Sequence, residues 1–220
     1  MTNSFDEIKE AYASNFKTHG VSSAAMLMPK GRHEARYAVV AEYLNQLSFP
    51  SLLDYGCGLG FLYEFLTHKE SKINYFGVDM TAEFIESCRE RFPAPARFEV
   101  IDPTGKITEH FDVVYASGVF NLKTAGSSSE SLNYVRERLQ NLYSISKKVL
   151  IVDFLSPDVD FKQEKSQHID YRLVLDWLVP GNTRRWVLRH DYLPYEYAII
   201  LFKDDEVKRP ENVFLLSSEQ

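Results

Sequence analysis

Three glycines at alternate positions, in the segment Asp54-Tyr55-Gly56-Cys57-Gly58-Leu59-Gly60, constrain this chain more than any other feature. An apolar run, residues 51–53, leads into them, and apolar residues at helical spacing follow from Phe61. This order predicts a strand, a tight turn and the start of a helix. Glycine in such a turn permits positive φ angles and lets a ligand approach the main chain. The segment therefore predicts a nucleotide-type cofactor at the first strand–helix junction of an open α/β sheet.

A second signal comes from the next apolar segment, residues 73–78, and from the acid that follows it. This acid, Asp79, lies nineteen positions after Gly60. An acid at the tip of the second strand can accept hydrogen bonds from both ribose hydroxyls of an adenosine. A dinucleotide site usually has a further glycine where this chain has Phe61, and Asp54 would repel its pyrophosphate. A carboxylate at position 54 suits instead a ligand that carries an ammonium and a sulfonium.

In these residues the chain resembles the class I S-adenosylmethionine-dependent methyltransferases, whose first motif is an acid followed by G-x-G-x-G. The resemblance covers roughly residues 50–203 and implies S-adenosyl-L-methionine as the cofactor. It implies that the glycines lie beneath the methionine part of the cofactor, that one acid orients the ammonium and that another binds the ribose. It also implies contacts with the adenine from the second and third strand tips, and with the reacting methyl from the fourth. The cofactor-binding residues that it implies are Asp54, Gly56, Gly58, Gly60, Asp79, Met80, Ile101, Asp102 and Ser117.

Several of these residues have an ordinary structural alternative. Asp79 and Asp102 stand where solvent-facing acids are common, Met80 could pack within its loop, and Ser117 could cap the following turn. The concurrence of acids at the carboxyl ends of strands favours the binding role, because ligands bind open sheets at that edge.

Helices and strands alternate along the chain, which predicts a mostly parallel sheet with right-handed crossovers. Two β-rich segments at the end, separated by a short turn, predict an antiparallel hairpin. The expected fold is a doubly wound, seven-stranded, mostly parallel sheet with a C-terminal antiparallel hairpin, helices on both faces and an N-terminal helical lid. Within this single domain, the expected parts are the lid at 1–47, the cofactor-binding core at 48–203 and a tail at 204–220. The expected helices are 4–14, 33–47, 61–68, 82–92, 130–145 and 166–178, and the later strands 97–101, 111–117, 148–154, 185–190 and 195–202.

The amino-acid composition limits the kinds of partner that we expect for this protein. The net charge is −6, and no segment concentrates Lys and Arg over several turns, which argues against a groove for DNA or long RNA. The two cysteines suggest neither a disulfide framework nor a metal site, so no metal is expected. No apolar run is long enough for a signal peptide or a membrane span. We therefore expect a cytoplasmic protein, a monomer or a homodimer, with a small-molecule substrate and no membrane partner.

The catalytic residues are less defined, because methyl transfer from a sulfonium needs a general base only when the acceptor loses a proton. The fourth strand ends in Ala116-Ser117-Gly118 and lacks the N-P-P-Y or D-P-P-Y motif of enzymes that methylate amino groups of nucleic acids. Other polar residues could act near the methyl, although loop histidines are usually solvated and helical tyrosines usually packed. The candidate bases are His19, Asp153 and His168, with Tyr12 and Tyr171 behind them, and the candidate anion contacts are Arg32 and Arg36.

The sequence thus predicts a methyltransferase that acts on oxygen, nitrogen or carbon of a small molecule. Two alternatives stay open. One is a non-catalytic S-adenosylmethionine-binding partner or regulatory protein, and the other is an RNA- or protein-directed methyltransferase.

Overall fold

The computed structural model describes residues 4–28, 31–124 and 127–203. Its strands form one seven-stranded sheet in the order β3-β2-β1-β4-β5-β7-β6. The pairs among β1 to β5 are parallel, and β7 pairs antiparallel with both β5 and β6. The predicted sheet and its C-terminal hairpin are confirmed. The strands are β1 (Ser51–Tyr55), β2 (Asn74–Asp79), β3 (Arg97–Val100), β4 (Phe111–Ala116), β5 (Ser146–Leu155), β6 (Trp186–Arg189) and β7 (Glu196–Phe202).

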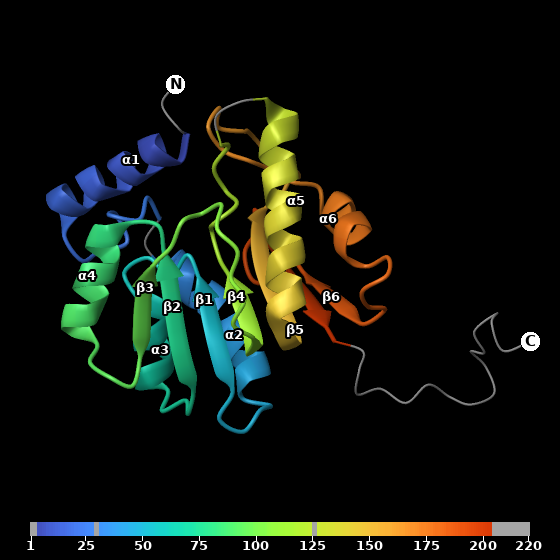
Figure 1. The fold of residues 1–220 in the computed structure, drawn as a ribbon. Helices are drawn as coiled ribbons and strands as arrows, with labels where there is room; N and C mark the ends of the chain where they lie inside the picture. The colour runs from blue at the N-terminus through green and yellow to red at the C-terminus, as the bar shows by residue number, and fades with distance from the viewer. Residues whose placement is uncertain (1–3, 29–30, 125–126, 204–220) are drawn as a thin grey trace, which may run out of the picture.

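Helices cover both faces of the sheet, with α5 and α6 in front and α2 and α3 behind in Figure 1. Each face has its own hydrophobic core, because alternate strand residues point to opposite sides. Leu53 and Val114 pack toward α5 and α6, while their neighbours Leu52 and Val113 pack toward α2 and α3. The helices are α1 (Ser4–His19), α2 (Arg32–Leu44), α3 (Phe61–His68), α4 (Ala82–Arg91), α5 (Ser128–Ile145) and α6 (Tyr171–Leu178).

The sixth helix begins later than the sequence predicted. The expected helix over 166–178 is wrong in its first five residues, which run extended beside the loop after β4. There the Gln167 N–H donates to the Asn121 carbonyl at 2.8 Å, and His168 forms a parallel bridge with Leu155. The helix starts only after Asp170, whose side chain accepts a hydrogen bond from the Arg172 N–H and caps it.

Other boundaries move by a few residues. The first helix runs five residues past the expected end at Ser14, and α5 begins at Ser128 instead of Glu130. The latter shift comes from a capping box between Ser127 and Glu130. The expected tail, residues 204–220, lies outside the described residues.

Helix α1 lies beyond the carboxyl ends of β2 and β3 and crosses above α4 (Figure 1). It is held there by a small aromatic cluster, in which the rings of Tyr12 and Phe16 meet Phe84 edge to face at 5.8 and 5.7 Å. The N-terminal segment therefore covers the edge of the sheet where ligands bind in open α/β folds. Within the described residues, no helix is long and apolar enough to cross a membrane.

Candidate cofactor and acceptor site

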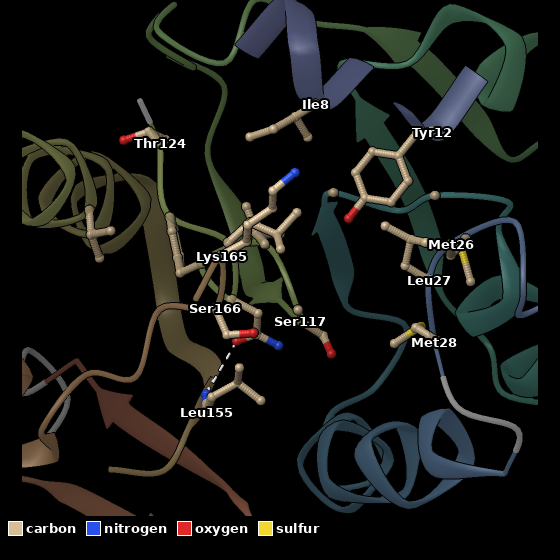
Figure 2. Close-up of a pocket in the computed structure, with 18 of the residues that line it drawn as sticks. Ile8, Tyr12, Met26, Leu27, Met28, Ser117, Thr124, Leu155, Lys165 and Ser166 are labelled. Atoms are coloured by element: carbon tan, nitrogen blue, oxygen red, sulfur yellow. Dashed lines mark hydrogen bonds between the residues drawn. The ribbon is translucent and has the colours of Figure 1, made fainter. Parts of the chain in front are cut away.

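A cavity of about 820 Å³ opens at the carboxyl edge of the sheet. Its walls are mostly apolar and come from α1, from residues 26–28, from the tips of β1, β2 and β4, and from the loops that follow β4 and β5 (Figure 2). A cavity of this size, with few polar groups, is typical of small-molecule sites. It is therefore the candidate functional site of the domain.

The glycine turn forms the floor of one end of this cavity. Gly56 and Gly58 line it, with φ angles of 79° and 53°. A Cβ on Gly56 would overlap the Val119 side chain, and one on Gly58 would overlap the Met26 thioether. Gly60, at φ 73°, is the N-cap of α3 and faces Phe92 and Cys88 instead. Two glycines therefore make room for the Val119 and Met26 side chains at the edge of the cavity, and the third permits α3 and α4 to pack closely.

Asp79 stands at the tip of β2 and lines the cavity. Its Oδ2 accepts the Gly58 N–H at 2.9 Å and its Oδ1 accepts the Thr81 N–H at 2.8 Å. Burial raises the pKa of this carboxyl, although the hydrogen bonds from the backbone oppose that effect. Because a carboxylate can accept about four hydrogen bonds, Asp79 can tie the turn to β2 and still receive a ligand.

Asp54 lies beneath the turn, in a second and much smaller cavity that it shares with Met26, Tyr37 and Ser117. It is 3% exposed, and the Tyr75 hydroxyl donates a hydrogen bond to its Oδ2. Burial raises the pKa of Asp54 to about 7, against the effect of the Tyr75 hydrogen bond. A buried carboxyl with such a pKa favours a cation as its ligand.

The other predicted cofactor contacts fall into two groups, those that line the large cavity and one that does not. Met80, Ile101 and Ser117 line the large cavity, and Ser117 also borders the small one. Asp102 is exposed and outside the lining, because its Oδ1 accepts the N–H and the hydroxyl of Thr104, each at 2.7 Å. Those hydrogen bonds lower the pKa of Asp102. The structure therefore does not place the Asp102 side chain in the cavity, where the predicted adenine contact would need it.

The three candidate bases lie in different surroundings. His168 lines the large cavity, and its Nδ1 lies 2.6 Å from the Ser156 carbonyl oxygen. Asp153 is buried outside this lining, and its Oδ1 accepts the Gly118 N–H at 2.8 Å. His19 is exposed at the end of α1 and does not line the cavity. Of the three, only His168 faces the space where an acceptor can bind.

The arginines of α2 do reach the cavity. Arg36 is 5% exposed, and its Nε donates to Glu196 Oε2 at 2.6 Å, while Arg32 lies 3.6 Å from Glu196 Oε1. The Arg36 Nη1 is buried with no hydrogen-bond partner among the described residues, on the side toward Gly118. A buried donor without a partner is an anomaly that a bound ligand can relieve.

Sequence reasoning missed several residues of the lining. Met26, Leu27 and Met28 come from a segment without periodicity, and Phe161 and Lys165 come from a polar loop. The Met26 thioether accepts the Leu59 N–H at 3.5 Å, directly over the glycine turn. No local pattern marks these residues, because only the tertiary fold brings their segments to the cavity. Among the described residues, no group of acids, histidines and cysteines could hold a metal ion.

The sheet order and the cavity at its carboxyl edge define an α/β protein of the Rossmann-like class. Residues 53–147 match a family described as a methyltransferase domain. The matched domain and the fold together support a class I S-adenosylmethionine-dependent methyltransferase.

Individual proteins agree with this assignment. The chain is 26% identical over 155 residues to Rv1506c of Mycobacterium tuberculosis, described as a candidate methyltransferase, a match that covers 70% of this chain and 93% of the relative. Two solved structures share the fold at 14% identity. The match with the magnesium protoporphyrin IX methyltransferase of Synechocystis PCC 6803, with bound SAM, has a TM-score of 0.64. It covers 92% of this chain and 98% of that protein. The match with the plantazolicin methyltransferase BpumL, in complex with a triazolic desmethylPZN analog and SAH, has a TM-score of 0.62 and covers 90% of this chain and 92% of that protein.

Proposed function

We propose that this methyltransferase transfers its methyl group to a small molecule that binds in the same cavity as the cofactor. The observation that carries the proposal is the continuity of that cavity, which is lined both by the glycine turn and by the loops that follow β4 and β5. The part lined by these two loops is called the acceptor compartment below. Structural neighbours that act on magnesium protoporphyrin IX and on plantazolicin support a small-molecule acceptor.

The residues at one end of the cavity fit S-adenosylmethionine. Gly56 and Gly58 line this end of the cavity, where the proposal places the methionine chain, beside the Val119 and Met26 side chains that pack against the two glycines. Asp54 matches the ammonium, and the unpartnered Nη1 of Arg36 matches the carboxylate of the same amino acid. When bound, the cofactor supplies a methyl group activated by a sulfonium.

The nucleoside end is assigned to the tips of β2 and β3. In the proposal Asp79 accepts the ribose hydroxyls, and Met80 and Ile101 border the adenine. Ser117, at the tip of β4, borders the methyl group. Asp102 stays a proposed adenine contact that would require its side chain to turn from Thr104.

His168 is the proposed general base for an acceptor that loses a proton. Its Nδ1 must be the donor toward the Ser156 carbonyl, because a carbonyl oxygen only accepts. In the neutral ring this leaves Nε2 with a free lone pair. Since His168 lines the cavity, the acceptor proton can move to Nε2 as the oxygen or nitrogen attacks.

Cofactor binding tests the first part of this proposal. We expect S-adenosylhomocysteine to bind the wild-type protein in calorimetry, and Asp79→Asn to weaken binding by about 1–3 kcal/mol through the loss of a buried acceptor. Asp176→Asn, which alters an exposed acid on α6, is the matched control and should bind normally. A folded wild-type protein that binds no S-adenosylhomocysteine would refute the proposed cofactor site.

Transfer of a labelled methyl group to a metabolite panel tests the second part. Once an acceptor is found, His168→Gln should lower kcat by about 10²–10⁴-fold while leaving the affinity for S-adenosylhomocysteine unchanged. Glutamine can still donate to the Ser156 carbonyl but cannot take the proton. His110→Gln, at an exposed position outside the cavity, is the control. If kcat survives in His168→Gln, His168 is not the base.

A further inference from the structure

Several exposed apolar side chains line the cavity. The described part of the chain has seven large hydrophobic residues with exposed side chains, and three of them line this cavity. These three, Leu27, Phe161 and Tyr195, are 56%, 74% and 37% exposed and come from separate segments. Exposed apolar side chains along a cavity are typical of a binding region. The apolar lining of the cavity thus extends to side chains that solvent reaches.

Among the described lysines and arginines that line the cavity, Lys165 is the one without an ion pair. Glu196 is taken by the arginines of α2, and Asp160 accepts the Tyr195 hydroxyl at 2.8 Å. Lys165 also lines the cavity, and its ammonium forms no hydrogen bond or ion pair with any residue that the structure describes. Figure 2 shows the Lys165 side chain extending into the cavity. An ammonium with three donors and no acid beside it is suited to an anionic group of a ligand.

The backbone holds Lys165 in place, so its position is a property of the fold. The Lys123 N–H donates to the Lys165 carbonyl at 2.9 Å, and Leu122 forms an antiparallel bridge with Ser166. These contacts tie the loop after β5 to the loop after β4, which starts at Ser117. The lysine is therefore anchored relative to the strand tip that borders the methyl group in the proposed site.

We infer that the methyl acceptor is an amphipathic molecule, with an apolar body and an anionic group such as a carboxylate, sulfonate or phosphate. Lys165 binds the anion, and Leu27, Phe161 and Tyr195 cover the part of the body that reaches the rim. The inference rests on the proposed function, because it names the class of substrate for the same cavity.

A pair of fluorescent probes tests the charge requirement. The probes are 8-anilinonaphthalene-1-sulfonate and its neutral counterpart N-phenyl-1-naphthylamine, titrated into protein saturated with S-adenosylhomocysteine. We expect the sulfonate probe to bind more tightly. Lys165→Gln should weaken the sulfonate probe about three- to tenfold, as for a partly solvated ion pair, and change the neutral probe less than about twofold. Lys162→Gln removes an exposed lysine of the same loop that does not line the cavity, and should change neither.

The apolar rim is tested with the same titrations. Phe161→Ala should weaken both probes about fivefold because it removes apolar area from both complexes. Phe49→Ala, which alters another exposed phenylalanine away from the cavity, should weaken neither.

The inference is overturned if the two probes bind equally, if Lys165→Gln leaves the sulfonate probe unchanged, or if neither probe binds while S-adenosylhomocysteine does. Calorimetry with S-adenosylhomocysteine alone measures the cofactor site separately. A failure there counts against the proposed function, and the probe comparison in cofactor-free protein then still decides the acceptor class.

Discussion

The buried carboxyl of Asp54 makes cofactor affinity depend on pH in a direction that the structure fixes. Burial raises its pKa to about 7, so at neutral pH about half of the molecules carry the proton. The ammonium of the cofactor binds the ionised form. Binding therefore lowers the pKa of Asp54 and releases a proton.

The magnitude follows from that pKa. The ionised fraction rises from about one in eleven at pH 6 to about ten in eleven at pH 8. The Kd for S-adenosylhomocysteine should therefore fall about tenfold over this range, and about half a proton should be released per binding event at pH 7. Calorimetry in buffers with different ionisation enthalpies measures both quantities.

Two variants isolate Asp54. Asp54→Asn keeps an acceptor for the Tyr75 hydroxyl and should abolish most of the pH dependence. Tyr75→Phe removes the hydrogen bond that stabilises the carboxylate, so the whole curve should move to higher pH. If Asp54→Asn keeps the wild-type slope, another group titrates and the reasoning is refuted.

The same shift has a consequence for the unliganded protein. Because the folded-state pKa lies above 3.8, the ordinary value for an aspartic acid, the folded protein binds more protons than the unfolded chain between about pH 4 and about pH 7. The contribution of Asp54 to the free energy of unfolding is therefore highest below this window and falls as the pH rises through it. Urea unfolding of the wild type and of Asp54→Asn at several pH values measures this contribution as a difference.

Two further predictions concern packing around the cofactor turn. Gly58→Ala places a Cβ against the Met26 thioether at a φ of 53°, so it should lower both stability and affinity for S-adenosylhomocysteine, and adding Met26→Ala should restore part of the loss because the clash is removed while the strain stays. An unrestored double variant would assign the whole effect to the backbone. Phe84→Ala should lower the free energy of unfolding by about 3–5 kcal/mol, since Phe84 is 2% exposed beneath α1, whereas Phe49→Ala should change it by less than about 0.5 kcal/mol. Equal effects in urea unfolding would contradict the role of Phe84 in holding α1.

Much of the cofactor end was predictable because it depends on short-range rules. A glycine turn between a strand and a helix gives its own geometry, and acids at strand tips meet at one edge of a parallel sheet. Gly56, Gly58, Asp79, Met80 and Ser117 accordingly all line the cavity. Asp102 differs because a local hydrogen bond with Thr104 competes for its side chain. The sequence pattern has no means to weigh that competition.

The start of α6 shows the same limit for the fold. Residues 166–170 were predicted to be helical, yet hydrogen bonds to the loop after β4 hold them extended. The hydrogen-bonded partners Gln167 and Asn121, for example, are more than forty residues apart in the sequence. Non-local pairing overrides propensity there, and as a result His168 faces the cavity instead of a helix surface.

By itself the sequence determined the class of fold, the order of its elements and the cofactor turn, because hydrophobic periodicity and glycine conformation act within a few residues. Tertiary structure alone decided the acceptor compartment. Leu27, Phe161 and Lys165 belong to segments that share no motif, and only the closing of α1 and the β5–α6 loop over the sheet brings their side chains to one space.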